Sequence, residues 1–409
     1  MRRLLVFLFM CSGGWAMSWS AWTACIQTAW SNCPLDAGTY QVAGPLYPAV
    51  GVTMSGSGTS NYSTVLQRPS GAGGYPLINI TASSVAIYNL TIDGNRYSFP
   101  NAQTGCGSNQ TEACGPAGAY GCTGATGANN GQTYDIVTTV PATIDQVAMW
   151  NSAGVTPLYM SGGTIEFSSF YYGNSNGPWL TGAQFADVHD NAMQYNGTAG
   201  IRFSGTAGAN LQRTSFFENR YEMPDGAGGG QIYIDYGAQW VYIFNNTVDG
   251  NNWVAPARPT QINGCYGPDT AQGVSGIEVE PASTKNKVYG NEVTRNTGSG
   301  ISVHSATSLY LSGYNSDGTY KYIHDNTGNA PPFNRPTLGI EFLYTSYGSS
   351  TGITLDRILS KNNSGDAVSF QFDSGASGPG WSGNHCLLSS YTTSWNLTQP
   401  TPASTTTCP

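Results

Sequence analysis

Charge is what this sequence has little of, since Asp, Glu, Lys and Arg make up only 9% of its 409 residues. Disordered chains combine high charge with few aromatic residues, whereas 12% of this chain is aromatic. The low charge therefore indicates a folded protein. Basic residues are the scarcer kind, with 15 Lys and Arg against 23 Asp and Glu. This balance argues against nucleic acid as a partner. It also disfavours a polyanionic partner unless a cation assists its binding.

Long apolar runs are missing after the first residues of the chain. Arg2 and Arg3 precede the apolar run Leu4–Met10, and small residues follow it, so we expect residues 1–16 to be a signal peptide cleaved after Ala16. A lipoprotein attached through Cys11 is a minor alternative. No later run is long enough to span a bilayer, so no membrane insertion is expected. The sequence predicts a secreted, extracellular protein, with a periplasmic or cell-surface location as the alternative. Without the two arginines, 13 basic residues face 23 acidic ones, a net charge of about −10.

The stretch GIEVEPASTKNKVYGNEVTRN, residues Gly276–Asn296, has the alternation of a strand with one apolar and one polar face, and no helical stretch adjoins it. Ile277 and Val279 form the apolar face, and two carboxylates point outward. Similar spacings recur along the chain, with a period of 22 to 23 residues from Asn174 to Asn196 to Asn219. A fixed period of this size is typical of a solenoid. Short strands joined by Gly and Asn bends predict a parallel β-helix, with Asn tolerating the left-handed conformation and stacking in a ladder.

The order G-I-x-V-x, then V-x-x-N, then N resembles the repeat of right-handed parallel β-helix proteins of the pectate-lyase-like superfamily. Val85–Asn95 resembles one of their N-terminal rungs, and the resemblance covers about residues 75–390. It implies an all-β, single-stranded solenoid that cleaves an extracellular polysaccharide in a groove over one strand stack. The family also contains adhesins and inactive binders. We expect an N-terminal cap at 17–70, the β-helix at 71–390 and a C-terminal tail at 391–409.

Nine cysteines are present, and Cys11 lies in the signal peptide. The other eight are an even number in an exported protein, which predicts disulfides, with metal binding as the minor alternative. Cys25 with Cys33 and Cys386 with Cys408 could close the two ends of the solenoid. The sequence leaves the pairing open. The remaining candidates lie in long loops: Cys106, Cys114, Cys122 and Cys265.

Aligning the strand starts places the outward residues of successive rungs in two columns. The first contains Arg202, Tyr233, Glu278, Ser302, Glu341 and Ser369, and the second contains Ser204, Asp235, Glu280, His304, Leu343 and Gln371. Rungs lie about 4.8 Å apart, so the acidic residues and the histidine should crowd together. The candidate catalytic residues are Glu280, Asp235, Glu278, Glu341 and His304.

Crowded carboxylates cannot all ionise without cost, so at least one should keep its proton to higher pH and serve as a general acid. An ionised neighbour could act as base or nucleophile, and His304 could tune either group. A solvated acidic strip or a structural calcium site is the competing interpretation. His189 lies near a bend and is interpreted as structural. We expect no cofactor, with calcium as the one possible ion, and a monomeric protein.

Two long insertions, from Phe99 to about Tyr134 and from Asn252 to Ser275, break the period and could wall the groove. Trp179, Trp253 and Tyr266 are candidates to stack on sugar rings. Packing of these aromatic side chains against the coil is an equally good interpretation for each. The other candidate substrate-binding residues are Arg202, Tyr233 and Gln371.

Two differences from the pattern of this superfamily bear on which reaction the chain could catalyse. The chain has no Asp-Asp pair, which polygalacturonases of this superfamily use, and Arg202 is the only outward arginine in the two columns. A groove rich in acids and poor in bases favours a glycoside hydrolase over a polysaccharide lyase. A lyase would remain possible if calcium occupied the acidic patch and His304 or Tyr233 abstracted the proton. The third hypothesis is a solenoid that binds glycans or mediates adhesion without catalysis.

Overall fold

A computed structural model describes most of the solenoid and part of its C-terminal end. The described residues are 16–58, 60–70, 75–95, 134–152, 156–173, 176–182, 184–197, 199–219, 230–252, 274–314, 319, 321–326, 329–330, 335–336, 339–344, 350, 352–356, 358–363, 368–372, 377–381, 385–386 and 390–393. Several predicted features lie outside these residues, among them most of both insertions and the tail.

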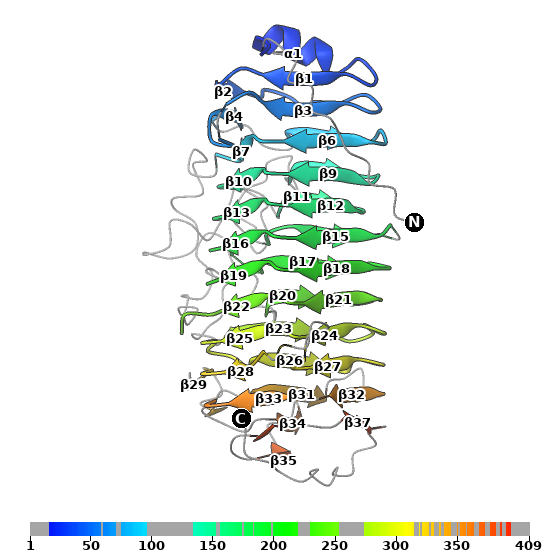
Figure 1. Ribbon diagram of the computed structural model, residues 1–409, viewed down its shortest axis with the longest axis vertical. Coiled ribbons are helices and arrows are strands. Elements are labelled where there is room, and N and C mark those ends of the chain that lie inside the picture. The colour runs from blue at the N-terminus through cyan, green and yellow to red at the C-terminus, as the bar shows by residue number, and fades with distance from the viewer. Residues whose placement is uncertain are drawn as a thin grey trace, which may run out of the picture.

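The described chain winds into three long sheets that run side by side along the molecule (Figure 1). Sheet A contains, in order, β1 (Asn32–Leu35), β3 (Thr53–Gly56), β6 (Val85–Tyr88), β9 (Ala142–Asp145), β12 (Gly163–Glu166), β15 (Ala186–His189), β18 (Ala209–Gln212), β21 (Val241–Phe244), β24 (Lys287–Tyr289), β27 (Tyr310–Ser312), β32 (Ile353–Asp356) and β37 (Ser390–Thr393). Sheet B contains β2 (Gly38–Gln41), β4 (Thr64–Gln67), β7 (Thr91–Asp93), β10 (Ala148–Trp150), β13 (Ser169–Tyr171), β16 (Ala192–Gln194), β19 (Ser215–Phe217), β22 (Thr247–Asp249), β25 (Glu292–Thr294), β28 (Ile323–His324), β33 (Leu359–Lys361) and β36 (His385–Cys386). Sheet C contains β5 (Ile78–Ile80), β8 (Tyr134–Thr138), β11 (Thr156–Met160), β14 (Trp179–Thr181), β17 (Ile201–Ser204), β20 (Gly230–Ile234), β23 (Ser275–Val279), β26 (Ile301–His304), β31 (Ile340–Tyr344), β34 (Val368–Phe372) and β35 (Ser377–Trp381).

Each coil contributes one strand to each sheet in turn, and neighbouring coils pair in parallel, so the architecture is the predicted right-handed parallel β-helix. A short antiparallel pair, β29 (Asn329–Ala330) and β30 (Arg335–Pro336), stands apart. The solenoid begins earlier than residue 71, since β1–β4 already pair in the sheets. At the other end β35, β36 and β37 pair antiparallel with the preceding strands.

The core is a set of apolar columns that run through the coils. Ile201, Ile232, Ile277, Ile301 and Ile340 are consecutive register partners in sheet C, as the spacing predicted. All five are at most 3% exposed. Each fully buried Ile contributes about 1.5–3 kcal/mol, so the aligned columns supply the main stabilising contribution.

Buried amide ladders join the coils at two bends. Asn196 Nδ2 donates to Asn219 Oδ1 at 2.9 Å, and Asn296 Nδ2 donates to Asn326 Oδ1 at 3.1 Å. A second ladder joins further asparagines on the other side of sheet B. These bonds satisfy polar groups that would otherwise be costly inside the coil. The predicted ladder is confirmed, but the left-handed conformation falls on the residue before these asparagines, as at Tyr195 (φ 55°).

The N-terminal end of the solenoid is covered by α1 (Trp19–Cys25). Trp22 is fully buried and donates its indole N–H to the carbonyl oxygen of Cys33 at 2.8 Å. The predicted disulfide between Cys25 and Cys33 is present and ties the helix to β1. The cap therefore covers a strand edge that would otherwise be open. Five of the other candidate cysteines lie outside the described residues, and the side chain of Cys386 is not described.

Among the described residues, no helix has the length and apolar character needed to cross a bilayer.

Candidate functional site

The candidate residues of the first column lie on consecutive strands of sheet C. Arg202 on β17 pairs in register with Tyr233 on β20, which pairs with Glu278 on β23. Glu278 pairs with Ser302 on β26, and Ser302 pairs with Glu341 on β31. The alternation of apolar and polar residues turns these side chains away from the core, because successive residues of a strand point to opposite faces.

Glu278, Glu280 and His304 form the centre of the site. Their ligand atoms all lie within 4.8 Å of one another. His304 Nδ1 is 3.2 Å from Glu280 Oε1 and 3.9 Å from Glu278 Oε1. The cluster arises because Glu280 and His304 come directly after Val279 and Val303, which are register partners in the core.

The electrostatics of the cluster favour a charged imidazole. Burial alone would lower the pKa of His304, but its hydrogen bond to Glu280 and the surrounding glutamates raise that pKa to about 9. Burial works to raise the pKa of Glu280, yet the hydrogen bonds from His304 and Glu278 and the charges of His304 and Arg202 hold it below its ordinary value. At neutral pH the cluster therefore contains an imidazolium next to an ionised carboxylate.

The Nε2 atom of His304 is connected to Glu341 by hydrogen bonds through Ser302. Nε2 lies 2.8 Å from Ser302 Oγ, and the Ser302 hydroxyl donates to Glu341 Oε2 at 3.5 Å. Ser299 also donates to this carboxyl oxygen, at 2.7 Å. A protonated imidazole donates from both nitrogens, so His304 connects Glu280 to Glu341 through Ser302.

Arg202 and Asp235 form the N-terminal side of the site. Arg202 Nε donates to Asp235 Oδ2 at 2.9 Å, and Nη2 donates to the same oxygen. The guanidinium lies 4.2 Å from the ring centroid of Trp179 and 5.4 Å from that of Tyr233. Burial and the nearby carboxylates raise the pKa of the Tyr233 phenol, so this group stays protonated at neutral pH.

The carboxylates are less exposed than the sequence suggested. Glu278 and Glu341 are each only 3% exposed, and Asp235 is 9% exposed. Replacing a buried, hydrogen-bonded carboxyl group disturbs its neighbours, so we expect substitutions of these residues to lower stability as well as to change the chemistry of the site. Glu280 and His304 keep more side-chain exposure, 19% and 18%.

Aromatic rings extend the column beyond Arg202 toward the N-terminus. Tyr159 pairs in register with Trp179, and their ring centroids are 5.4 Å apart. Tyr134 pairs in register with Thr156 and so lies outside the column, but its ring centroid is 5.0 Å from that of Tyr159. Neither tyrosine was singled out from the sequence, although continuing the column by two rungs, through Trp179, would have found Tyr159. Trp253 and Tyr266 lie outside the described residues, and the side chain of Gln371 is not described.

Glu278, Glu280 and His304 are also the group that could hold a metal ion among the described residues. Calcium prefers six to eight oxygen ligands, so a set with one imidazole suits it poorly. Two carboxylates and one histidine suit zinc better, provided that the imidazole is neutral.

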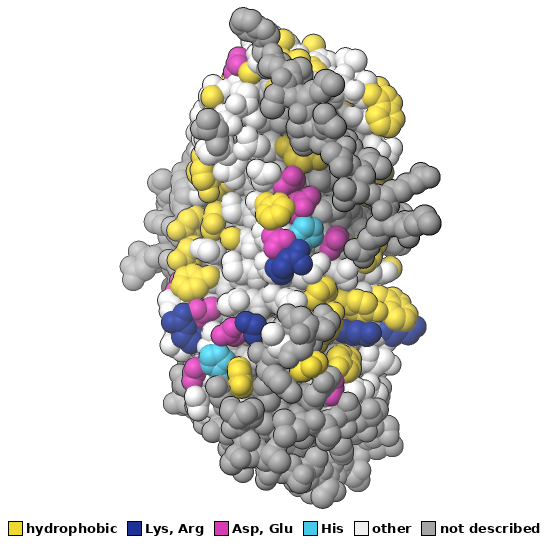
Figure 2. All heavy atoms as spheres, viewed as in Figure 1, with side chains coloured by type: hydrophobic (Ala, Val, Ile, Leu, Met, Phe, Trp, Pro, Cys, Tyr) yellow, Lys and Arg dark blue, Asp and Glu magenta, His cyan; other side chains and the backbone are white. Residues whose placement is uncertain are grey.

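The face over sheets A and B carries few charged side chains, which gather into small groups (Figure 2). In one group Arg213 donates to both carboxylate oxygens of Asp190, and His189 lies 2.9 Å from Asp190. The hydrogen bonds from Arg213 hold the pKa of Asp190 below its ordinary value. Here the arginine compensates the carboxylate directly, whereas Glu278 and Glu280 lie beside a histidine.

The sequence also matches the model of a known protein family. The family model described as "Right handed beta helix region" matches residues 77–317, more than half of the chain. The chain belongs to this right-handed β-helix family. No curated protein sequence gives a significant match to it.

Solved structures share the β-helix fold at low sequence identity. The A-module of Azotobacter vinelandii mannuronan C-5 epimerase AlgE4 aligns with a TM-score of 0.56 and 13% identity, over 87% of this chain and 90% of that one. A variant of the periplasmic alginate epimerase AlgG aligns with a TM-score of 0.52 and 13% identity, over 87% of this chain and 76% of that one. At this identity the likeness shows the fold alone.

Proposed function

We propose that this β-helix protein is a polysaccharide-degrading glycoside hydrolase whose general acid is Glu278 and whose nucleophile is Glu280. The observation that carries the proposal is the cluster of these two carboxyl groups with His304. A β-helix offers a long sheet surface on which a chain of sugars can lie, and sheet C carries aromatic rings next to the carboxyl pair.

The surroundings assign a different role to each carboxyl group. The hydrogen bond between Glu278 and Glu280 requires one proton, and the imidazolium of His304 favours the ionised form of Glu280. Glu278 therefore carries the shared proton and acts as the general acid toward the glycosidic oxygen. Glu280 acts on the anomeric carbon as the nucleophile. The nearest ligand oxygens of the two carboxyl groups lie within 4.8 Å of each other, well short of the roughly 6.5–9.5 Å of inverting enzymes, so the proposed mechanism is a retaining one.

Hydrolysis fits these groups better than β-elimination does. A lyase needs a cation to neutralise the uronate and a base to remove the C5 proton. Arg202 is already paired with Asp235, and both His304 and Tyr233 are protonated at neutral pH. A neutral glycan also avoids repulsion by the acidic groups.

The test is a reducing-sugar screen over a panel of neutral polysaccharides, followed by NMR of the first product. We expect new reducing ends and retention of the anomeric configuration. Glu278→Gln and Glu280→Gln should abolish most turnover. Glu292→Gln is the matched control, because Glu292 lies on sheet B beside Lys321 and His324. Turnover by both cluster variants at the wild-type rate would overturn the assignment.

The second candidate is a reaction at C5 of a uronic acid, either elimination or epimerisation. The observation that favours it is the presence of Arg202, Tyr233 and His304 within one site, since such groups neutralise a carboxylate and transfer protons. The structural neighbours include an enzyme that is named a mannuronan C-5 epimerase. Alginate belongs in the screen for this reason. Products that absorb in the ultraviolet would indicate elimination, and a changed uronate composition without chain cleavage would indicate epimerisation.

The same polysaccharide panel also tests whether the protein binds glycans without catalysis. Binding of a glycan that survives loss of all cluster carboxylates, with no product, would support the binder.

We propose that the protein is exported, on the strength of residues 1–16. Fractionation of the producing cell, with N-terminal sequencing of the mature protein, tests this.

A further inference from the structure

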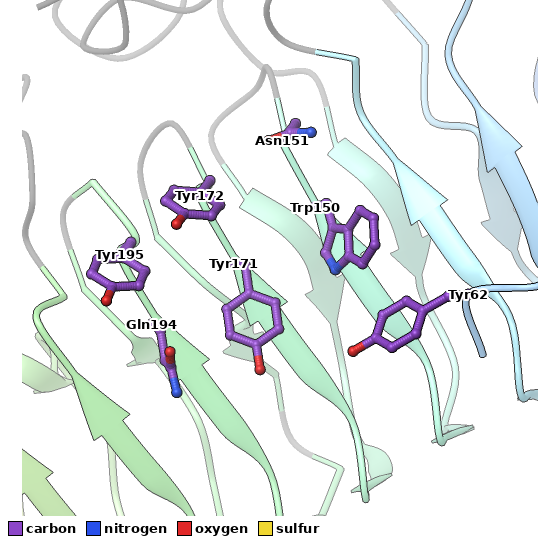
Figure 3. A pocket seen from close by; sticks show the side chains of 7 residues that line it. All are labelled: Tyr62, Trp150, Asn151, Tyr171, Tyr172, Gln194 and Tyr195. Atoms are coloured by element: carbon purple, nitrogen blue, oxygen red, sulfur yellow. The ribbon is translucent and has the colours of Figure 1, made fainter. Parts of the chain in front are cut away.

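A second surface, on sheet B, has the chemistry of a sugar-binding site. It is an open hollow of about 490 Å³ lined by Tyr62, Trp150, Asn151, Tyr171, Tyr172, Gln194 and Tyr195 (Figure 3). Five of the seven residues are aromatic and the other two are amides. None of the seven carries a charge at neutral pH.

The hollow is built from the repeat itself. Trp150, Tyr171 and Gln194 are register partners on β10, β13 and β16, and they project from the sheet side by side. Asn151, Tyr172 and Tyr195 each follow one of them and form a second row in Figure 3. Spacing between rungs is about 4.8 Å, so the two rows present rings and amides at regular intervals along the solenoid axis.

The rings hold one another in place. Tyr172 and Tyr195 stack with centroids 5.1 Å apart and planes 7° apart. The ring centroids of Tyr62 and Trp150 are 5.1 Å apart. In Figure 3, Tyr62 lies across the hollow from the pair Tyr172 and Tyr195. Tyr62 is 50% exposed and Tyr172 is 41% exposed. The surface is therefore ordered, accessible and aromatic at once.

The bend conformation fixes the positions of two of the rings. Tyr172 and Tyr195 have φ of 53° and 55°, and Asn151 holds the same conformation one coil earlier (φ 49°). Glu218 and Arg295 repeat it in later coils (φ 46° and 53°), so this conformation belongs to the coil rather than to the tyrosines. It places the two tyrosine rings in one row with Asn151 (Figure 3).

We propose that this hollow binds a segment of a neutral polysaccharide, apart from the cluster on sheet C. Aromatic faces pack against the C–H faces of pyranose rings, while phenol and amide groups bond to the hydroxyls. Two carboxylates adjoin the hollow, and both are hydrogen-bonded within the protein. Asp93 accepts from Gln67 at 2.7 Å and Asn151 at 3.4 Å. Burial and the charge of Glu218 raise the pKa of Tyr195, and Glu218 accepts from Asn251. The choice of a neutral glycan rests on the proposed function, which the sheet B surface would assist by retaining the polymer.

Binding is measured without turnover, in the Glu280→Gln background, by affinity electrophoresis in gels that contain xylan, galactomannan, mixed-linkage β-glucan or alginate. We expect at least one neutral polysaccharide to retard the protein. Tyr62→Ala with Tyr171→Ala should weaken that binding at least tenfold. Phe185→Ala is the control, since Phe185 is 56% exposed and does not line the hollow.

Circular dichroism and the melting temperature would confirm that each variant is folded. If the double variant loses its fold, Tyr62→Ala alone is used, with a threefold or larger loss expected. Retardation that is equal in all variants, or present only with alginate, would overturn the proposal. The proposal would also be overturned if light scattering showed a dimer of the parent protein that the tyrosine variants lose while they keep their glycan binding. The surface would then join two copies of the chain. Binding measured in this way can succeed even if the screen for turnover fails.

Discussion

At the scale of single residues, the site depends on which carboxyl group keeps its proton. His304 lies closer to Glu280 than to Glu278, 3.2 Å against 3.9 Å, so its hydrogen bond goes to Glu280. Glu278 is almost fully buried, and ionising it next to Glu280 would place two negative charges together. In the proposed mechanism this asymmetry makes Glu278 the general acid and Glu280 the nucleophile.

Removing either glutamate should reduce turnover strongly. Glu280→Gln removes the nucleophile, and Glu278→Gln removes the transferable proton, so each should lower kcat by about 10²–10⁴. Stability should change little in Glu280→Gln and more in Glu278→Gln, because Glu278 is the more buried of the two. Steady-state kinetics and urea unfolding measure both effects. Equal kcat in the wild type and Glu280→Gln would remove Glu280 from the mechanism.

His304 should make stability depend on pH. Its pKa in the folded protein, about 9, is raised from the ordinary value of 6.5, so folding favours the protonated form. The stabilisation is complete below pH 6.5, declines as pH rises and is lost above pH 9. A shift of this size corresponds to a contribution of about 3 kcal/mol.

Urea unfolding at pH 6 and pH 9.5 checks this expectation. The wild type should lose more free energy of unfolding between these values than His304→Gln does. His189→Gln, on sheet A, serves as the control and should behave like the wild type. An identical pH dependence in His304→Gln and the wild type would contradict the assignment.

At the scale of strands and bends, the amide ladder is the element that joins coils outside the sheets. Asn296 accepts from Gln231 at 2.9 Å and donates to Asn326 at 3.1 Å, with no exposed surface. Asn296→Ala leaves the amide of Gln231 and the carbonyl group of Asn326 without these partners. We expect a loss of about 2–4 kcal/mol, because buried polar groups would be unsatisfied.

Thermal unfolding of Asn296→Ala tests the ladder. Asn32→Ala is the control, since Asn32 is exposed on β1, does not belong to the ladder and does not have a positive φ. A melting temperature for Asn296→Ala within one degree of the control would show that the ladder adds nothing to stability.

The register of sheet C was predictable, because the alternation within each strand, from which the strand starts were aligned, depends only on local sequence. The five stacked isoleucines and the alignment of Arg202 with Tyr233 and Glu278 follow from it. Burial of Glu278 was not predictable in this way, since it depends on what covers the outside of the coil. Asparagine adopts the left-handed conformation at some bends, such as Asn251 and Asn362, but the ladder asparagines do not, because the ladder needs the amide one position after the turn of the backbone.

The hollow on sheet B was likewise only partly predictable from the sequence. Trp150, Tyr171 and Gln194 share a column that the repeat predicts, but Tyr62 reaches it from the segment between β3 and β4. Periodicity places residues within a column, while contacts from a connecting segment depend on its path. Function was therefore harder to locate than fold.

At the scale of the whole molecule, stability is the sum of contacts between neighbouring coils, since each coil touches only the coils above and below it. Damage at one end should therefore remain local at first. The N-terminal cap offers a test, because α1 covers β1 and no further coil lies beyond it in Figure 1. An uncovered strand edge is also a site where chains associate.

Trp22→Ala should open this end of the solenoid. The fully buried indole of Trp22 stacks with Trp19 at 5.4 Å, so its loss should cost about 3–5 kcal/mol at the cap. Hydrogen exchange should speed up in β1–β4 and stay slow in β17–β26, and light scattering should detect association of the exposed edges. Trp30→Ala is the matched control, because Trp30 is 72% exposed and its removal should change stability by less than about 0.5 kcal/mol. Faster exchange along the entire solenoid in Trp22→Ala would show that the coils unfold as one unit and that the cap stabilises all of them.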